Sequence, residues 1–548
     1  MKLTKKMTGG EAIVHSVLAN GVDTIFGLPG AQTYPIFDAI YQSADIKEII
    51  SRHEQGAGYM AFGYAYATGK PGVFSVVPGP GILNAGAALS TADATNTPIL
   101  CLTGQVMSEF LGHGRGHLHE IRDQQGLLKS FIKHVDHIDD PTQTSKHINK
   151  AFQEMQSGRP GPASVEMCWD TMASKHDVDI LSGNSFIEKP ELNMDAINSA
   201  AKLISKSKKI MIMCGGGALH ASEEVRNFAE LLNAPVTSFR AGRGVVSEDH
   251  PCGISAAAAR LLWEETDLLI GIGSRLEMQY MRWGPWEKYL DRPPVDSPKL
   301  IRIDIDPNEM ERFIPDVAIV ADTIDGVSAL ITEVEKVGHL TGDNDRISVA
   351  KKTANKIIRE DIQPQMEYLD VIRDVLPRNG FFVEELCQVG FASNFGFPIY
   401  EPRTYVTTGY QGSLGFGFPT AIGVKVAMPD RPVVSIVGDG GFLFCMSELA
   451  SAVQQNIGVI TVVFNNSSYG NVRRDQERLY EGRLIGSDLD NPDMVKVAEA
   501  FGADAYRVNS PATLRPILEI AISNDRPAVI DVTIEKGTEA SPWKYLVG

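Results

Sequence analysis

The stretch VVSIVGDGGFLFCMSELASAVQQNIGVITVVFNN, residues 433–466, decides how the C-terminal third of the chain folds. Its two apolar runs, at 433–437 and 459–464, have the length and β-branched content of buried strands, and a helical pattern separates them. Strand, glycine turn, helix and strand is the pattern of a parallel sheet covered by helices. The residues after each strand would then lie at the carboxyl edge of the sheet, where ligands bind in this architecture.

Polar residues follow both strands of this stretch. The sequence G-D-G-G comes directly after the first strand, at 438–441, and N-N-S-S follows the second, at 465–468. Asp439 and Asn466 would therefore direct two oxygen ligands at one point from neighbouring strand ends. Hard oxygen ligands with open positions suit Mg²⁺, which completes its shell with phosphate oxygens. A helix expected at about 446–455 would offer its positive N-terminus to such a phosphate.

The same alternation of strands and helices extends along the whole chain. At 548 residues the chain is long enough for about three domains. We therefore predict an α/β protein of three doubly wound parallel-sheet domains, at 1–180, 188–340 and 360–548. A polar linker at 342–356 would join the second domain to the third. The other expected strands are 24–27, 72–77, 99–103, 268–271, 300–304, 404–407 and 528–534, and the expected helices include 10–20 and 55–68.

Composition and charge exclude several classes of function. A net charge of −17, without a block of like charge, argues against a general nucleic-acid binder. The N-terminal residues 1–22 have the pattern of an amphipathic helix rather than of a signal peptide, and no apolar run is long enough to cross a bilayer. The six cysteines are scattered and form no C-x-x-C pair, which suits a reducing compartment. We expect a cytoplasmic protein that binds neither nucleic acid nor a membrane.

The first segment adds a second group of motifs. It contains R-H-E-Q-G-A at 52–57, M-A-F-G-Y-A at 60–65, T-G-K-P-G-V at 68–73 and P-G-P-G at 78–81. Together with the G-D-G and N-N pattern of 438–466, these motifs closely resemble the acetolactate synthase (acetohydroxyacid synthase) large-subunit-like branch of the thiamine diphosphate-dependent enzymes. The resemblance covers nearly the whole chain in the family's order. It implies a pyrimidine-binding, a central and a diphosphate-binding domain.

The resemblance assigns cofactors and residues. It implies thiamine diphosphate and Mg²⁺, with Glu54 hydrogen-bonded to the pyrimidine ring so that the cofactor can lose a proton from its thiazolium carbon. Leu414 takes the place beneath the cofactor where the synthases usually have methionine. The implied metal ligands are Asp439, Asn466 and Ser468. The implied cofactor-binding residues are Glu54, Pro80, Asn84, Gly412, Leu414, Gly438, Asp439, Gly440, Gly441, Asn466, Tyr469 and Gly470.

The reaction implied is decarboxylation of a 2-oxo acid and transfer of the resulting carbanion to a second carbonyl. This chain has V-R-R-D at 472–475 where acetolactate synthases have V-R-Q-W, so their substrate-site tryptophan is missing. A 2-oxo acid decarboxylase and a 2-hydroxyacyl lyase therefore stay open as alternatives, and a flavin-dependent oxidoreductase is a third.

Four polar residues are the candidates for substrate contacts. Gln32 falls where related lyases place a polar side chain at the catalytic pocket. His113, His117 and His119 lie on a loop that faces the cofactor in the family. They could bind an anionic substrate or relay protons, and the alternatives are a solvated loop or a metal site.

Two further expectations concern partners and the central domain. Because Glu54 and Asp439 lie on different domains, the resemblance implies a site shared between subunits. A homodimer is then the minimum active unit, and tetramers are common in the family. The run C-G-G-G at 214–217 follows a strand, as in nucleotide-binding turns, but lacks the full G-x-G-x-x-G pattern. Relatives carry FAD or an ADP-like group there or nothing, and we expect this domain to be empty.

Overall fold

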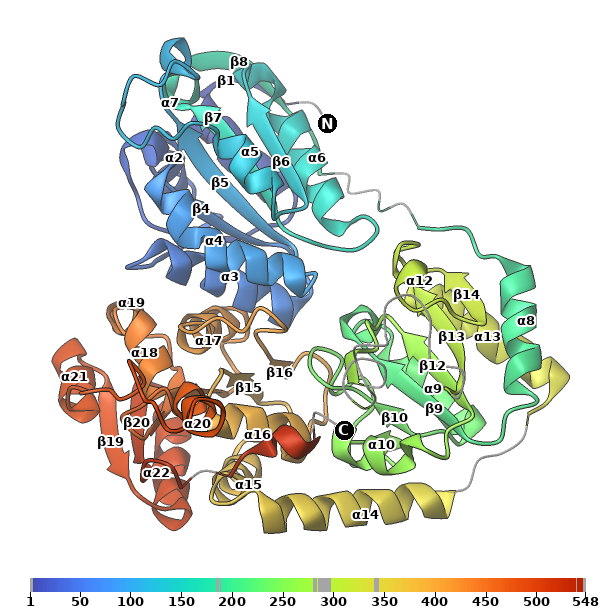
Figure 1. Cartoon of the computed structure of the whole chain (residues 1–548). Helices are drawn as coiled ribbons and strands as arrows, with labels where there is room; N and C mark the ends of the chain where they lie inside the picture. The colour runs from blue at the N-terminus through green and yellow to red at the C-terminus, as the bar shows by residue number, and fades with distance from the viewer. Residues whose placement is uncertain are drawn as a thin grey trace.

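The computed structural model describes residues 3–183, 187, 189–278, 283, 297–339, 344–538 and 540–545. The chain forms three lobes, each built on a six-stranded parallel sheet flanked by helices (Figure 1). The predicted α/β fold class is therefore confirmed. Within these described ranges, every helix is too short or too polar to cross a membrane.

The N-terminal domain has the strand order β3-β2-β4-β5-β7-β6. Alternate strand residues face two different apolar clusters, so helices cover both faces of the sheet. The strands are β2 (Thr24–Gly27), β3 (Lys47–Ile50), β4 (Gly72–Val76), β5 (Ile99–Gln105), β6 (His134–Ile138) and β7 (Ala163–Cys168). The helices are α1 (Gly9–Ala19), α2 (Tyr34–Gln42), α3 (Glu54–Thr68), α4 (Pro80–Ala94), α5 (Gln124–Lys129), α6 (Thr144–Gln156) and α7 (Trp169–Ala173).

The start of the chain differs from the expected helix over residues 1–22. Strand β1 (Leu3–Thr8) pairs antiparallel with β8 (Lys175–Ile180) at the other end of the domain, and helix α1 begins only at Gly9. Thr8 and Glu11 form a capping box that fixes this start, because the Thr8 hydroxyl accepts from the Glu11 N–H and the Glu11 carboxylate accepts from the Thr8 N–H.

The central domain has the strand order β11-β10-β9-β12-β13-β14. Its strands are β9 (Ile210–Cys214), β10 (Val236–Thr237), β11 (Gly253–Ile254), β12 (Leu268–Ile272), β13 (Lys299–Asp304) and β14 (Val317–Val320). Its helices are α8 (Met194–Ile204), α9 (Ser222–Leu232), α10 (Ala256–Trp263), α12 (Glu309–Arg312) and α13 (Thr323–Val337).

The C-terminal domain has the strand order β16-β15-β17-β18-β20-β19. Its strands are β15 (Phe381–Glu384), β16 (Tyr405–Val406), β17 (Val433–Gly438), β18 (Ile460–Asn465), β19 (Asp504–Val508) and β20 (Ala528–Thr533). Its helices are α15 (Gln365–Val375), α16 (Gln388–Gly396), α17 (Gly417–Ala427), α18 (Asp439–Cys445), α19 (Glu448–Gln454), α20 (Gly470–Leu479), α21 (Met494–Phe501) and α22 (Pro511–Asn524).

Of the stretch expected to be a linker, 342–356, the described residues 344–356 belong to a helix instead. Helix α14 (Asn344–Asp361) runs between the central and C-terminal lobes (Figure 1). Ile347, Ala350, Ala354 and Ile358 are buried, and their spacing places them on one narrow face. The remaining faces are polar, which hides this stripe in the composition of the sequence.

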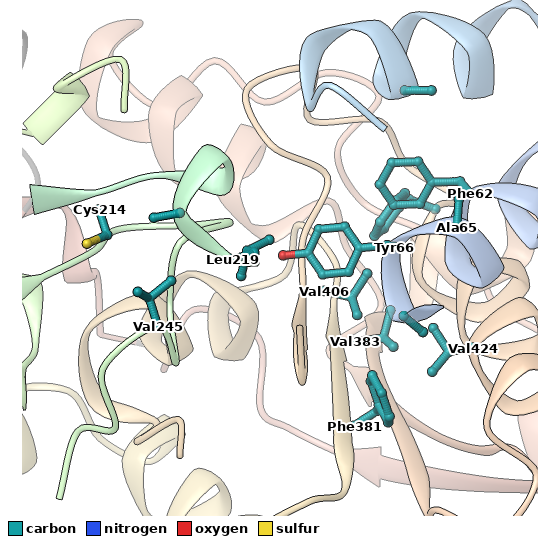
Figure 2. Close-up of a cluster of buried hydrophobic side chains, with 14 of the residues drawn as sticks. Phe62, Ala65, Tyr66, Cys214, Leu219, Val245, Phe381, Val383, Val406 and Val424 are labelled. Carbon is teal, nitrogen blue, oxygen red and sulfur yellow. The ribbon is translucent and has the colours of Figure 1, made fainter. Parts of the chain in front are cut away.

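The N-terminal and C-terminal domains pack closely through α3 and α17. Glycines make the approach possible, because a Cβ on Gly63 would lie 2.1 Å from the carbonyl oxygen of Thr420, and one on Gly423 would lie 1.9 Å from that of Met60. Figure 2 shows buried side chains of all three domains in one cluster, with Tyr66 of α3 directed toward the central domain. The Tyr66 hydroxyl donates to the Ala241 carbonyl at 3.1 Å.

Candidate active site

A cavity of about 280 Å³ lies at the carboxyl edge of the C-terminal sheet. It receives the ends of β17 and β18, which are neighbours in the sheet. Every residue that the sequence singles out in the C-terminal domain lines it. These residues are Gly412, Leu414, Gly438, Asp439, Gly440, Gly441, Asn466, Ser468, Tyr469 and Gly470.

Asp439 is the buried carboxylate of this cavity. It is the first residue of α18, a short helix that the sequence did not predict, whereas the helix expected at about 446–455 forms as α19. Burial raises the pKa of Asp439 above its ordinary value, and the amide of Asn491, which donates to Oδ2 at 2.6 Å, opposes the rise. Asn491 also donates to the Asn465 side-chain oxygen at 3.3 Å. It therefore holds the two strand ends together.

Asn466 organises the turn that follows β18. Its side-chain oxygen accepts from the Ser468 N–H at 3.1 Å and the Ser468 hydroxyl at 3.0 Å. Ser467 between them has φ of 50°, in the left-handed region. Tyr469 then packs so closely on Gly440 that a Cβ there would lie 2.4 Å from its ring. The G-D-G and N-N segments thus fit together as one unit.

A second buried carboxylate joins the loop of Leu414 to helix α18. Glu385 accepts from the N–H groups of Gly415 at 3.2 Å and Gly417 at 2.6 Å. A Cβ on Gly441 would lie 1.7 Å from Glu385 Oε1. Burial raises the pKa of Glu385 to about 7, although these hydrogen bonds oppose the rise.

Sequence reasoning missed Asn491 and Gln388. Gln388 begins α16 and lines the cavity, and its buried side-chain oxygen has no hydrogen-bond partner. A buried amide without a partner is uncommon and marks a place where a ligand would complete the hydrogen bonding. Neither residue belongs to a recognisable local motif.

Glu54 lies in the N-terminal domain, as the first residue of α3. It is half-buried, and Asn84 of α4 donates to its Oε2 at 3.0 Å. A Cβ added to Gly81 would lie 3.6 Å from the Glu54 Cγ, so the P-G-P-G turn lies beside Glu54. Pro80 is exposed at the first position of α4. The structure therefore brings Glu54, Pro80 and Asn84 together on one side of this domain.

The candidate substrate residues separate into two groups. Gln32 is buried, donates to the Leu118 carbonyl at 2.8 Å and contacts the His119 Nδ1 through its oxygen at 2.7 Å. His117 instead stacks on Phe110 with 4.1 Å between ring centroids. His113 is exposed. Within the described ranges, no three His, Cys, Asp or Glu side chains converge in a metal-binding cluster, so this loop shows no such site.

The two halves of the predicted site remain separate within one chain. Among the described residues, none from the N-terminal domain lines the cavity that holds Asp439. The next residue, Gln55, reaches that region, because its side chain donates to the Leu414 carbonyl at 3.5 Å.

Comparison with known proteins decides the family. Three models of thiamine pyrophosphate enzymes match in order: the N-terminal TPP binding domain at 7–127, the central domain at 197–330 and the C-terminal TPP binding domain at 387–532. The chain belongs to the thiamine pyrophosphate enzyme family. It is an acetolactate synthase-like member of this family, which confirms the resemblance seen in the sequence.

Curated relatives match along almost the entire chain. Probable acetolactate synthase large subunits of Methanococcus aeolicus and Methanocaldococcus jannaschii are 32% and 33% identical, each over 98% of this chain and 93% of the relative. A probable 2-ketoarginine decarboxylase of Pseudomonas aeruginosa is 31% identical over 92% of this chain and 89% of its own length. This thiamine pyrophosphate enzyme is therefore similar both to carboligases and to a decarboxylase.

The cavity fits the diphosphate end of the cofactor and a metal ion. Asp439 and the amide of Asn466 supply oxygen donors at one edge of the cavity, and oxygen is what Mg²⁺ prefers. Gln388 offers an unpaired buried group to a ligand. The volume is near the lower limit for small-molecule sites, about 300 Å³, as expected of a cavity that holds only part of a ligand.

Proposed function

We propose that this enzyme uses thiamine diphosphate and Mg²⁺ to decarboxylate a 2-oxo acid and to join the remaining acyl group to a second carbonyl compound. The observation that carries the proposal is the cavity in which Asp439 and Asn466 meet at neighbouring strand ends. The names of the two archaeal relatives support the acetolactate synthase reaction. Bound thiamine diphosphate would supply a thiazolium carbon that, once deprotonated, attacks a carbonyl and stores the electron pair released by decarboxylation.

The residues of the chain have distinct roles in this proposal. Asp439, Asn466 and Ser468 hold the metal ion, and Gln388 and the glycines at 438–441 surround the diphosphate. Leu414, which lines the cavity, would pack against the bound cofactor. Glu54 holds a proton at the pyrimidine nitrogen, and Asn84 orients the Glu54 carboxyl through the hydrogen bond at 3.0 Å.

We propose a homodimer in which Glu54 of one subunit serves the cavity of the other. Each half of the site is bordered by exposed apolar side chains, which a partner would cover. Leu83, beside Asn84, is 56% exposed, and Leu118 of the histidine loop is 63% exposed. Next to the cavity, Phe444 of α18 is 59% exposed and Val472 49%. A second copy would bury these surfaces and complete the site together.

Gln32 and His119 are proposed to contact the substrate. Their hydrogen bond at 2.7 Å fixes both side chains, and the carbonyl of His119 lies only 2.3 Å from where a Cβ on Gly79 would be. The histidine is therefore anchored to the turn that precedes Pro80. His117, which is stacked on Phe110, and the exposed His113 are weaker candidates for the same role.

We propose that the central domain carries no FAD. A cavity of about 360 Å³ does adjoin its glycine turn at Gly216 and Gly217. The cations that line it already have partners, however, because Lys189 and His220 contact Asp322, and Arg159 contacts Asp306 and Glu309. Arg275 and Arg403 donate to the backbone carbonyls of Ala94 and Tyr66, so a dinucleotide diphosphate would have to compete for them. An absorption spectrum of the purified protein tests this point, because bound flavin is yellow.

Two observations favour a simple decarboxylase as the second candidate. The 2-ketoarginine decarboxylase relative is nearly as similar as the synthases. The segment 472–475 also lacks the tryptophan expected of a synthase substrate site. Both candidates use the same cofactor site. We also propose a cytoplasmic location, since all six cysteines are free thiols, as a reducing compartment favours.

One assay separates the two candidates. Metal-stripped protein is mixed with thiamine diphosphate, Mg²⁺ and pyruvate, and carbon dioxide and acetolactate are followed together. Acetolactate with carbon dioxide supports the carboligase, and carbon dioxide alone supports the decarboxylase. If neither forms although calorimetry shows bound cofactor, pyruvate is not the donor, and other 2-oxo acids are tested. Absence of cofactor binding with Mg²⁺ present contradicts the proposal.

A further inference from the structure

Glu448 is a buried carboxylate for which the proposed function has no role. It is the first residue of α19 and has no exposed surface. The Arg52 N–H lies 3.1 and 3.0 Å from its two oxygens, and the His53 N–H donates to Oε1 at 2.9 Å. The Ser451 hydroxyl donates to Oε2 at 2.8 Å. The C-terminal domain thus binds two consecutive backbone N–H groups of the N-terminal domain.

These two N–H groups belong to the residues directly before Glu54. The first N–H groups of a helix have no partner within the helix and need one from outside. Glu448 satisfies those just outside α3, while the His53 ring accepts from the Gln55 N–H at 3.1 Å. The backbone from which the Glu54 side chain projects is therefore fixed by a residue almost 400 positions away, as the sequence numbers show.

Gly56 shows how closely this contact is fitted. A Cβ at that position would lie 2.3 Å from Glu448 Oε1 and 2.7 Å from its carboxyl carbon. Gly56 has ordinary helical geometry inside α3, so no backbone strain requires a glycine there. The carboxylate itself is the reason for the missing side chain, since any larger residue would displace it.

Glu448 also lies shortly after the residues of α18 that line the cavity of its own domain. Helix α18 starts at Asp439 and leads into α19, which starts at Glu448. Gln55 makes a second link, since its side chain donates to the carbonyl of Leu414 at 3.5 Å. Residues 52–55 therefore contact the Leu414 loop, which lines the cavity, and α19, which follows α18, while Glu54 would serve the other cavity of the proposed dimer.

We propose that Glu448 is a positioning residue for Glu54. In the proposed dimer, Glu448 thereby connects the cofactor cavity of its own subunit to the Glu54 that serves the cavity of the partner subunit. The proposal rests on the proposed function in so far as Glu54 acts on the cofactor. An ordinary domain anchor at this place would stabilise the fold without affecting the reactivity of the cofactor. The two roles can therefore be told apart.

The test uses Glu448→Gln in the full-length protein. Glutamine keeps the size of the side chain but replaces one acceptor oxygen by an NH₂ group that faces the N–H groups of Arg52 and His53. In the cofactor-free protein, hydrogen–deuterium exchange followed by mass spectrometry should be several-fold faster for peptides that contain residues 52–56. With thiamine diphosphate and Mg²⁺ bound, the thiazolium proton should exchange for deuterium at least about 10-fold more slowly, because small displacements of catalytic groups are costly. The affinity for thiamine diphosphate should stay unchanged.

A matched control and a second perturbation complete the design. Glu519→Gln makes the same chemical change on the exposed face of α22 and should alter neither measurement. Gly56→Ala should reproduce the effects of Glu448→Gln by pressing on an intact carboxylate, and Glu448→Asp should restore part of the lost exchange rate. If Glu448→Gln does not fold, Ser451→Ala, which removes one hydrogen bond to the carboxylate, gives the same readouts on a smaller scale.

The outcomes are distinct from those that test the proposed function. A wild-type rate of thiazolium proton exchange in Glu448→Gln, or unchanged amide exchange at 52–56, overturns the positioning role. A wild-type rate in Glu54→Gln overturns the role of Glu54 instead, whatever the amide exchange shows. Slower thiazolium exchange together with faster amide exchange, absent from Glu519→Gln, supports the inference.

Discussion

The N-terminal and C-terminal domains are built on the same plan but present opposite kinds of surface. Both have six-stranded parallel sheets. In the C-terminal domain, two strand ends close over a cavity around a buried Asp439. In the N-terminal domain, Glu54 is only half-buried and its partner Asn84 is exposed beside an exposed leucine. One domain forms its cavity from its own residues, and the other presents Glu54 on a surface that the proposed partner subunit would cover.

In the proposed dimer, this difference predicts which domain would depend on the partner subunit. A carboxylate in a cavity is held by its own domain, whereas a carboxylate at an apolar surface acquires its environment only on assembly. The buried C-terminal half should therefore respond to changes in metal and pH, and the exposed N-terminal half should respond to changes in subunit composition.

The largest effect is expected from mixing two inactive variants. Glu54→Gln should lower turnover by about 10³-fold, within the range of general acid–base catalysis, and Asp439→Asn by at least about 100-fold, because it weakens metal binding. If each site takes Glu54 from one chain and Asp439 from the other, a mixed dimer contains one intact site and one doubly altered site. Unfolding and refolding the two variants together should then restore about a quarter of wild-type activity. Sites formed within single chains predict no recovery, and each variant refolded alone is the control.

The second prediction concerns the metal at the C-terminal half. In Asp439→Asn, a neutral amide replaces the carboxylate that Mg²⁺ would contact, and the affinity for thiamine diphosphate in the presence of Mg²⁺ should fall at least about 100-fold. Calorimetric titration with and without Mg²⁺ measures this. Asp490→Asn makes the same chemical change at an exposed position directly before Asn491 and is the matched control. Equal affinity in the wild type with and without Mg²⁺ would remove Asp439 from metal binding.

Much of the C-terminal half could be predicted from sequence because its signals are local. The motifs at 438–441 and 465–468 directly follow apolar runs, and the periodicity of those runs placed them at one sheet edge. Asn491 could not be found this way. It reaches Asp439 from a segment with no regular structure, and only the folded chain brings the two side chains together.

The misses elsewhere have the same physical cause. Strand β1 pairs with β8 across the whole N-terminal domain, and no local pattern signals a pairing over that distance. Helix α14 was obscured because its apolar stripe is narrow. The contact between Glu448 and residues 52–53 is likewise invisible in the sequence, although the helix expected at about 446–455 does form as α19.

The third prediction concerns the ionisation of Glu384 in the C-terminal domain. Glu384 is buried at the end of β15 with one oxygen unpaired, and burial raises its pKa to about 7, although the hydrogen bond from Thr407 opposes the rise. Because the unfolded state loses this proton near pH 4.5 and the folded state keeps it to about pH 7, folding stability should fall as pH rises through this window. Glu384→Gln keeps the acceptor for Thr407 and removes the titration.

Between pH 5 and 7, the free energy of unfolding should change by about 2 kcal/mol less in the variant than in the wild type, since one pKa unit corresponds to about 1.4 kcal/mol. Urea unfolding of the cofactor-free protein at the two pH values measures the difference. Identical pH dependence in both proteins would show that Glu384 ionises normally. Glu519→Gln on the exposed face of α22 should leave the wild-type dependence unchanged.

The smallest effect is expected at the exposed side of Glu54. Asn84→Ala removes the donor 3.0 Å from Glu54 Oε2, and the loss of one hydrogen bond to a carboxyl group should lower turnover by about 10-fold. In the separate chain this bond is exposed and should contribute little to stability, so the melting temperature should not change. The loss in turnover should therefore arise only where a partner subunit has excluded water from the pair. An equal loss of stability in the isolated chain would mean that Asn84 serves the fold of its own domain, and the contrast between the two halves would then be weaker than the exposed surface suggests.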